Sequence, residues 1–334
     1  MNARIAVLGA GSWGTALAIH CARVGHHVRL WGRDLSFMEE MQSTRRNARY
    51  LPEVHLPPGV LATTDLQTAL CDAPIVIAAV PSHGTRDVLT RALPFLADGA
   101  VLVSATKGLE TGSLDRMSQV MGEVAEGHPI AVLSGPSFAV EVARGLPTAV
   151  VVASSDESAT VRVQERLKGP AFRLYASDDV AGVEFGGALK NVIAIAAGVV
   201  EGLGIGHNAM AALITRGLVE MSRLACAAGS RRDTLAGLSG LGDLVLTCTG
   251  NLSRNRHVGI ELGRGRPLAD ILAETRMVAE GVRTTRAALA LGAKHDVELP
   301  LAAQMAAVLD GHTSARSAVE ALMLRPQRSE NDHS

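Results

Sequence analysis

The N-terminal region carries the pattern that most constrains the fold, because three spaced glycines directly follow a short apolar run. Residues 4–8 (RIAVL) predict a buried strand, and Gly9, Gly11 and Gly14 then give the spacing G-x-G-x-x-G before a helical pattern. In a dinucleotide-binding unit the first glycine permits a tight turn, the second lets a pyrophosphate approach the backbone, and the third lets the helix pack on the strand. A second strand pattern, HVRLW at 27–31, follows at the expected distance. The segment therefore predicts a strand–turn–helix that binds a dinucleotide.

The end of the second predicted strand indicates which dinucleotide is bound. NAD-selective units usually carry Asp or Glu at this position to bind the ribose 2′-hydroxyl, whereas this chain has Gly32 there and Arg33 next to it. A guanidinium beside the ribose suits a 2′-phosphate. Asp34 is open to two interpretations, either as the acid displaced along the chain or as an ion-pair partner of Arg33. The sequence thus favours NADPH, with NADH as the alternative.

Apolar runs continue in the rhythm of an α/β sheet as far as residue 177. Continuous runs of this kind are typical of strands buried on both faces of a parallel sheet, and they occur at 74–80, 100–108, 129–137, 148–154 and 171–177. Ligands bind outside the carboxyl ends of such strands. Four residues are therefore expected along one edge of the sheet: Ser82, Lys107, Gly135 and Ser137. Lys107 is either a site cation or a solvated loop lysine, and we favour the first interpretation.

The pattern changes beyond residue 177, where no strand-like run recurs and the sequence becomes helical. A chain of 334 residues exceeds the roughly 250–300 at which a single core stops growing, so two domains are expected. We predict an α/β protein with an N-terminal Rossmann-type dinucleotide-binding domain followed by an all-helical C-terminal domain for substrate binding and catalysis. The predicted bounds are 1–180 for the first domain, 181–325 for the second and 326–334 for a polar, disordered tail.

Composition excludes several classes of function. The formal net charge of −1 gives no electrostatic basis for binding nucleic acid or anionic membranes, so an anionic ligand must be held by local cations. The N-terminus imitates a signal peptide, but its glycines interrupt the apolar run, which favours a cytoplasmic protein without membrane insertion. The histidines form no cluster, and we predict no metal site. The four cysteines lack ligand spacing and predict free thiols: Cys21, Cys71, Cys226 and Cys248.

The helical half contains one long apolar stretch, residues 182–204, whose single cation is Lys190. Gly186, Ala194 and Ala197 fall on the same side of a helical wheel as this lysine. Small residues there would let another backbone or a flat ligand come close, so we expect this side to face a cofactor cleft between the domains. The alternative is a lysine that extends its ammonium to water from the edge of a core helix.

Three polar patches follow in the helical half. Asp243 is the only acid in the glycine-rich, apolar segment 237–248, where it serves either as a helix N-cap or as a site residue. The segment VAEGVRTT at 278–285 has no role that its spacing alone indicates. The remaining patch gathers hydroxyl, amide and guanidinium donors where a helix could begin, which suits either an anion site or a capped, exposed loop: Ser253, Arg254, Asn255 and Arg256.

Taken together, the motifs resemble the bacterial NAD(P)-dependent glycerol-3-phosphate dehydrogenase family. The resemblance covers nearly the whole chain except its C-terminal tail. It implies a cytoplasmic homodimer that reduces dihydroxyacetone phosphate to sn-glycerol 3-phosphate for phospholipid synthesis. The matching segments, in chain order, are GAGSWGTALA, LWGRD, NARYLP, AVPSH, SATKGLE, LSGPSFAVEVARGLPTAV, GALKNVIAIAAGVVEGLG, SGLGDLVLTC, SRNRHVG and VAEGVRTT.

The same resemblance implies roles for individual residues, with Lys190 as the catalytic lysine. The implied cofactor site, beyond the three glycines, consists of Ser12, Trp13, Arg33, Lys107, Ala139, Arg254, Val278 and Glu280. The implied substrate site consists of Lys107, Gly135, Ser137, Lys190, Asp243, Ser253, Arg254 and Asn255.

The implied reaction is hydride transfer to the C2 carbonyl of the substrate, so a positioned donor must stabilise and protonate the carbonyl oxygen. Lys190 is the expected general acid, and Asp243 would orient it. Lys107 would add a second cation, and repulsion between the two lysines favours a neutral form of one of them.

Two rival functions share part of these sequence features. Another two-domain NADP-dependent dehydrogenase, of the β-hydroxyacid or 6-phosphogluconate type, would also carry a lysine on the helix after the sheet. The SRNR cluster and the SGPSFA loop favour a small phosphorylated ketone instead. A nucleotide-sensing regulator would leave Lys190, Asp243 and Arg254 without a shared purpose.

Overall fold

The computed structural model describes residues 2–274, 280–327 and 329. The described chain divides into two compact units, Met1–Glu184 (unit 1) and Phe185–Ser334 (unit 2). The sequence placed the boundary at residues 180/181, where helix α8 (Val180–Gly202) begins, and the division falls later in the same helix. The predicted disordered tail lies mostly outside the described residues.

Unit 1 is built on an eight-stranded sheet in the order β10-β9-β8-β7-β6-β1-β2-β5. All neighbouring strands are parallel except β8 and β9. The central strand β1 pairs with β2 on one side and with β6 on the other, so that Ile5 lies opposite both Val28 and Ile75. The strands are β1 (Arg4–Leu8), β2 (His27–Trp31), β5 (Val60–Thr63), β6 (Ile75–Ala78), β7 (Val101–Ser104), β8 (Ile130–Ser134), β9 (Thr148–Ala153) and β10 (Phe172–Ser177).

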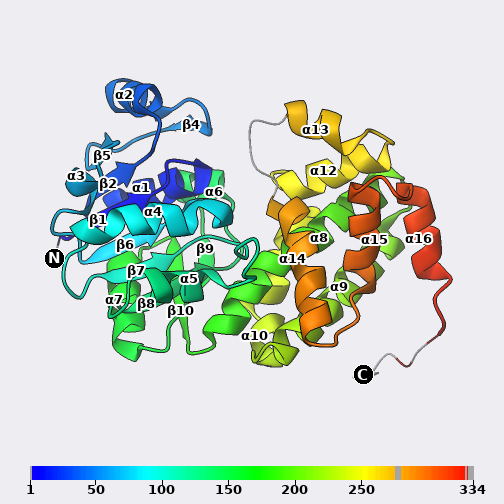
Figure 1. Cartoon of the computed structure of the whole chain (residues 1–334). Coiled ribbons are helices and arrows are strands. Elements are labelled where there is room, and N and C mark those ends of the chain that lie inside the picture. Colours follow the sequence, from blue (N-terminus) through cyan, green and yellow to red (C-terminus); the bar gives the residue numbers. More distant parts are fainter. Residues whose placement is uncertain (1, 275–279, 328, 330–334) are drawn as a thin grey trace. The chain divides into compact units, whose positions relative to one another are not determined.

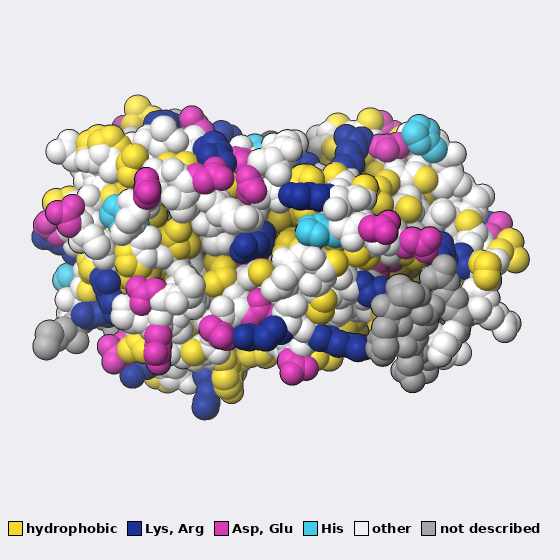
Figure 2. All heavy atoms as spheres, turned by 60° about the horizontal axis from the view of Figure 1, so that its bottom comes forward, with side chains coloured by type: hydrophobic (Ala, Val, Ile, Leu, Met, Phe, Trp, Pro, Cys, Tyr) yellow, Lys and Arg dark blue, Asp and Glu magenta, His cyan; other side chains and the backbone are white. Residues whose placement is uncertain are grey.

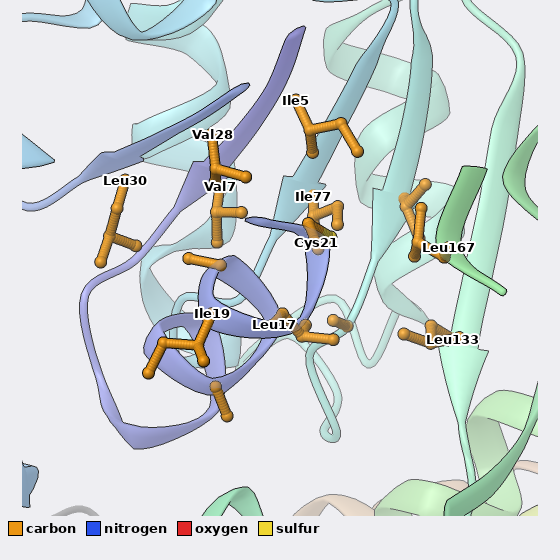
Figure 3. Packing of buried hydrophobic residues seen from close by; sticks show 14 of the residues in the cluster. Ile5, Val7, Leu17, Ile19, Cys21, Val28, Leu30, Ile77, Leu133 and Leu167 are labelled. Carbon is orange, nitrogen blue, oxygen red and sulfur yellow. The ribbon is translucent and has the colours of Figure 1, made fainter. Parts of the chain in front are cut away.

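Helices cover both faces of this sheet, which explains why its strands are apolar throughout. One buried cluster joins the sheet to α1 (Ser12–Arg23), α2 (Leu35–Thr44), α6 (Ala139–Arg144) and α7 (Glu157–Leu167). In Figure 3 the side chain of Cys21 on α1 lies beside that of Ile77 on the sheet, and Leu17 and Val7 belong to the same cluster. A second cluster joins the opposite face to α3 (Leu66–Leu70), α4 (Thr85–Ala92) and α5 (Met117–Val124). The predicted Rossmann-type domain is thereby confirmed.

The sequence did not predict the edge strand β5 or the small hairpin of β3 (Arg46–Asn47) and β4 (Leu51–His55). The hairpin lies next to α2 in Figure 1. Two short 3-10 helices, η1 (Ser82–Gly84) and η2 (Leu93–Phe95), flank α4.

The described part of unit 2 is helical throughout, as predicted, and Figure 1 shows its helices around α8. By length and composition α8 could span a membrane, with a mean hydropathy of 1.5, but that apolar window is fully buried in the structure, as in the core helix of a folded domain. The other helices are α9 (His207–Ala227), α10 (Arg232–Ala236), the π-helix η3 (Leu238–Gly242), α11 (Asp243–Thr249), α12 (Arg254–Gly263), α13 (Leu268–Glu274), α14 (Glu280–Lys294), α15 (Pro300–Leu309) and α16 (Ala315–Met323).

The small residues of α8 serve helix packing. A Cβ on Gly198 would lie 2.0 Å from the carbonyl oxygen of Arg256 on α12, and a Cβ on Gly186 would lie 2.5 Å from that of Ser239 in η3. Ala194 and Ala197 are completely buried. The expectation that this side of the helix leaves room for a cofactor is therefore wrong for Gly186, because the backbone of η3 fills the space.

Charged side chains of both signs are interspersed over the molecular face shown in Figure 2. This distribution agrees with the net charge of −1. An anionic ligand must therefore be held by individual cations and N–H groups at its site.

Candidate active site

The glycine-rich turn after β1 has the geometry that its spacing predicts. Gly9 has φ +114°, and a Cβ on it would lie 2.6 Å from the carbonyl oxygen of Ala79, at the end of β6. A Cβ on Gly14 would lie 1.9 Å from the carbonyl oxygen of Gly9. A Cβ on Gly11 would meet nothing within 4 Å. The first and third glycines are thus required by the fold, whereas the second leaves open space in front of the backbone.

The start of α1 has further features of an anion-binding turn. Gly11 is the N-cap and supplies no side-chain oxygen to the N–H groups of the first turn, which begins at Ser12. The indole nitrogen of Trp13 is buried and has no hydrogen-bond partner within the described structure. A buried donor of this kind normally has an acceptor. The open turn and this indole N–H both fit a dinucleotide phosphate and its neighbouring groups.

The carboxylate of Asp34, just after β2, pairs with Arg49, so the interpretation of Asp34 as the ion-pair partner of Arg33 is wrong. Its Oδ1 accepts hydrogen bonds from the Phe37 N–H at 3.1 Å and the Ser36 hydroxyl at 2.9 Å, and its Oδ2 accepts one from Arg49 at 3.0 Å. These hydrogen bonds, that of the Phe37 N–H first and that of Arg49 next, lower the pKa of Asp34. Asp34 is therefore the N-cap of α2 and the ion-pair partner of Arg49, while Arg33 is exposed.

The loops after β7 and β8 meet at one hydrogen-bonded cluster. The ammonium of Lys107 donates to the carbonyl oxygen of Gly135 at 2.9 Å, and the hydroxyl of Ser137 donates to the same oxygen at 2.9 Å. Gly135 adopts φ +142°, which a residue with a side chain rarely adopts. Ala139 begins α6 two residues after Ser137. The structure thus brings together three residues that the sequence predicted along one edge of the sheet.

Lys190 lies at the centre of a buried polar cluster in unit 2. Its ammonium donates to Oδ1 of Asp243 at 2.5 Å and to the hydroxyl of Thr247 at 2.8 Å. The lysine side chain is 7% exposed and that of Asp243 is 1% exposed. The alternative of a lysine extended to water is therefore wrong, because its ammonium is buried against a carboxylate.

Helix α11 presents both partners of Lys190 on one face. Asp243 is its first residue and Thr247 lies one turn later, where positions i and i+4 are neighbours. The π-helix η3 directly precedes this turn and packs closely on α8 at Gly186, which fixes the start of α11 beside the lysine. Thr247 was missed from the sequence, although its i+4 spacing from Asp243 was the available signal.

The donor patch at the start of α12 has two kinds of member. Ser253 is the N-cap of the helix, with its hydroxyl accepting from the Arg256 N–H at 3.3 Å, and Arg254 is exposed. The buried amide of Asn255 donates to Oδ1 of Asn191 at 2.9 Å and accepts from the Gly281 N–H at 3.0 Å. The side chain of Asn255 therefore links α8, α12 and α14.

Two further site residues were predicted in the segment 278–285. Glu280 begins α14, and Val278 lies outside the described residues. Among the residues that the structure describes, no group of three or more His, Cys, Asp or Glu side chains could hold a metal ion. The described cysteines are free thiols.

Comparison with known protein families identifies both parts of the chain. Residues 4–160 match the family model described as the NAD-dependent glycerol-3-phosphate dehydrogenase N-terminus, and residues 179–320 match that of the C-terminus. A curated relative from Koribacter versatilis, named glycerol-3-phosphate dehydrogenase [NAD(P)+], is 53% identical over 332 residues, which cover 98% of each chain. One from Myxococcus xanthus with the same name is 51% identical over 98% of each chain.

Comparison with solved structures indicates the same family. The crystal structure of glycerol-3-phosphate dehydrogenase from Coxiella burnetii matches with a TM-score of 0.94 and 44% identity, covering 97% of this chain and 99% of that one. A 3-hydroxyisobutyrate dehydrogenase from Mycobacterium tuberculosis, of the rival β-hydroxyacid type, reaches a TM-score of 0.52 at 17% identity, which shows a shared fold alone. From these matches over both units, the chain belongs to the NAD-dependent glycerol-3-phosphate dehydrogenase family.

Proposed function

We propose that this protein reduces dihydroxyacetone phosphate to sn-glycerol 3-phosphate with NADPH, and with NADH as an alternative cofactor. The observation that carries the proposal is the buried cluster of Lys190, Asp243 and Thr247, which holds the single cation of a mostly apolar helix. A charge is kept in such a place at a cost in stability. A catalytic role of Lys190 as proton donor would explain why a buried charge is kept at this position despite that cost.

Unit 1 supplies the cofactor site in this proposal. The open face of Gly11 and the first turn of α1 receive the pyrophosphate, and Ser12 and Trp13 contact it or the groups beside it. Arg33, which is exposed at the end of β2, pairs with the 2′-phosphate. The bound cofactor supplies the hydride. Ala139 in α6, Arg254 and Glu280 complete the proposed set, together with Val278, which is outside the described residues.

Lys190 is the proposed general acid. Negative charge develops on the carbonyl oxygen during reduction, and a buried ammonium stabilises that charge more strongly than one in water. Asp243 holds the ammonium through a 2.5 Å hydrogen bond, and Thr247 fixes its direction through a second. Lys190 then donates a proton to the oxygen in reduction and accepts it back in oxidation.

The substrate phosphate is the proposed ligand of the N-terminal turn of α12. Free N–H groups at a helix N-terminus attract an anion, and the guanidinium of Arg254, the first residue of α12, adds a charge there. Because the side chain of Asn255 is held by Asn191 and Gly281, we assign its contribution to its backbone N–H. Ser253 contributes as the N-cap. Lys107, Gly135 and Ser137 in unit 1 complete the proposed substrate set.

The cellular setting belongs to the same proposal. The protein acts in the cytoplasm as a homodimer, and its product supplies the backbone of glycerophospholipids. Gel filtration with light scattering of the purified protein tests the dimer.

The experiment that tests the function follows the absorbance of NADPH with dihydroxyacetone phosphate as substrate. The wild-type protein is expected to oxidise NADPH in proportion to substrate, and Lys190→Ala is expected to lose most of this turnover while binding NADPH with nearly unchanged affinity. The control is Lys294→Ala, which removes an exposed lysine from α14 and should leave turnover unchanged. Full turnover in Lys190→Ala would refute the assignment of the acid.

A further inference from the structure

The ion pair between Asp34 and Arg49 lies where a dinucleotide-binding unit distinguishes its two cofactors. A carboxylate after the second strand binds the ribose hydroxyls of NAD and would repel a 2′-phosphate. In this chain both oxygens of Asp34 are already engaged, by the N-terminus of α2 and by Nη1 of Arg49 at 3.0 Å. Arg49 therefore removes an obstacle to NADPH that the backbone position of Asp34 would create.

Arg49 is also held in place by two aromatic rings. Its guanidinium carbon lies 4.5 Å from the centroid of the Phe37 ring and 6.0 Å from that of Tyr50. The two rings pack edge to face at 5.6 Å. With its direction set in this way and 40% of its side chain exposed, Arg49 can reach a ligand anion while still paired with Asp34. Cation–π contacts leave the edge N–H groups of a guanidinium available for such pairing.

The loop that carries Arg49 is fastened to the glycine-rich turn. Asn47, which is completely buried, donates to the carbonyl oxygen of Ala10 at 3.0 Å and to the hydroxyl of Thr15 at 2.7 Å. Its own side-chain oxygen accepts the Tyr50 N–H at 2.9 Å. Ala10 lies between the first two glycines of the fingerprint, so the position of Arg49 is set relative to the turn proposed to bind the pyrophosphate.

We propose that Arg49 is a specificity-determining residue that favours NADPH over NADH, by neutralising Asp34 and by presenting a second guanidinium, beside Arg33, to the 2′-phosphate. The inference rests on the proposed cofactor site. It gives the NARYLP segment, which contains Arg49, a role in cofactor selection in addition to those of the glycine fingerprint and Arg33.

The test measures dissociation constants for NADPH and for NADH by fluorescence titration, without substrate. Arg49→Met keeps an unbranched side chain over Phe37 but removes the charge. It is expected to weaken NADPH binding by roughly tenfold or more, as for loss of a charge-assisted contact, and to leave NADH binding unchanged or tighter. Adding Asp34→Asn to this variant should restore part of the NADPH affinity, because the exposed carboxylate is gone.

Two further variants keep the result interpretable. Arg46 is an exposed residue of the same hairpin and contacts His55. Arg46→Met removes the same charge as Arg49→Met, and it should leave the ratio of the NADPH and NADH dissociation constants unchanged. Arg49→Lys should retain most of the preference if charge carries it. An unchanged ratio in Arg49→Met, or equal losses for both cofactors, would overturn the inference. Failure of the proposed function is separate, since it would show as no turnover of dihydroxyacetone phosphate by a wild-type protein that still binds both cofactors.

Discussion

Removing Asp243 tests the buried Lys190 cluster through stability, independently of turnover. The two side chains are 7% and 1% exposed, with Nζ and Oδ1 2.5 Å apart. Asp243→Ala removes the carboxylate beside a buried ammonium that also donates to the Thr247 hydroxyl. Breaking a buried pair in this way typically costs about 3–5 kcal/mol. We expect a loss of that size in the free energy of unfolding.

A double-mutant cycle separates the ion pair from simple loss of packing. Lys190→Met with Asp243→Leu replaces both charges by apolar groups of similar size, and such a replacement is often close to neutral. The double variant should therefore be more stable than the single variant Asp243→Leu. Together with Lys190→Met, the cycle should give a coupling of at least about 2 kcal/mol between the two positions. Asp310→Ala serves as the control, because it breaks an exposed pair with Arg286, and it should change stability far less.

The assay can follow the two units separately. Both tryptophans of the chain, Trp13 and Trp31, lie in unit 1, whereas the helical unit 2 contributes strongly to far-ultraviolet circular dichroism. In urea titrations Asp243→Ala should shift the dichroism transition to lower urea and leave the main tryptophan fluorescence transition in place. A variant within about 1 kcal/mol of the wild type, below the loss typical of a broken buried pair, would refute the reasoning that Asp243 compensates a buried charge.

Other perturbations distinguish binding from folding in the remaining parts of the structure. Gly11→Ala should leave the free energy of unfolding within about 0.5 kcal/mol of wild type and weaken NADPH binding, because its Cβ occupies open space; Gly14→Ala should instead destabilise unit 1, since its Cβ would lie 1.9 Å from the carbonyl oxygen of Gly9. Equal stability of these two variants in urea would contradict this. Asn47→Ala removes two buried hydrogen bonds and one partly buried one, and it should lower the tryptophan-monitored stability by about 1–3 kcal/mol for each group left unpaired. Burial raises the pKa of Glu220, whose carboxylate accepts two N–H groups at the start of α15, to about 7. The folded state therefore binds this proton more tightly than the unfolded state, and stability should fall by up to about 3 kcal/mol as pH rises from about 4.5 to 7. Glu220→Gln should lose this part of the pH dependence in urea titrations; an identical pH profile would contradict the assignment.

The extent of sequence prediction differs between elements for physical reasons. The strands of the sheet interior were predicted because burial on both faces requires continuous apolar runs. The edge strand β5 was missed because VLAT is short and half exposed, and the hairpin that carries Asn47 was missed because its strands are short and mostly exposed. The antiparallel pairing of β8 with β9 was also not predicted, since a local apolar pattern carries no information on strand direction.

The candidate site shows a similar division. Lys190 was identified because a single cation in an apolar helix is visible in the sequence, and Asp243 because it is a lone acid among glycines. The pairing of Asp34 with Arg49 joins residues far enough apart in sequence that helix periodicity does not relate them. Thr247 differs, because it lies one helical turn after Asp243. Once a helix is expected to begin at Asp243, this spacing alone predicts that the two side chains share a face.

The glycines illustrate why the sequence alone could not predict the remaining details of the site. In unit 1, Gly11 leaves space that no protein atom fills within 4 Å, whereas in unit 2 a Cβ on Gly186 or Gly198 would lie 2.5 Å or less from a carbonyl oxygen. One glycine therefore keeps a backbone open to a ligand, and the others let two backbones close on each other. The sequence contains the same residue in both cases. What separates them is the partner across the gap, and that partner comes from a distant segment, so the sequence could not decide whether another backbone or a flat ligand meets the small-residue side of α8.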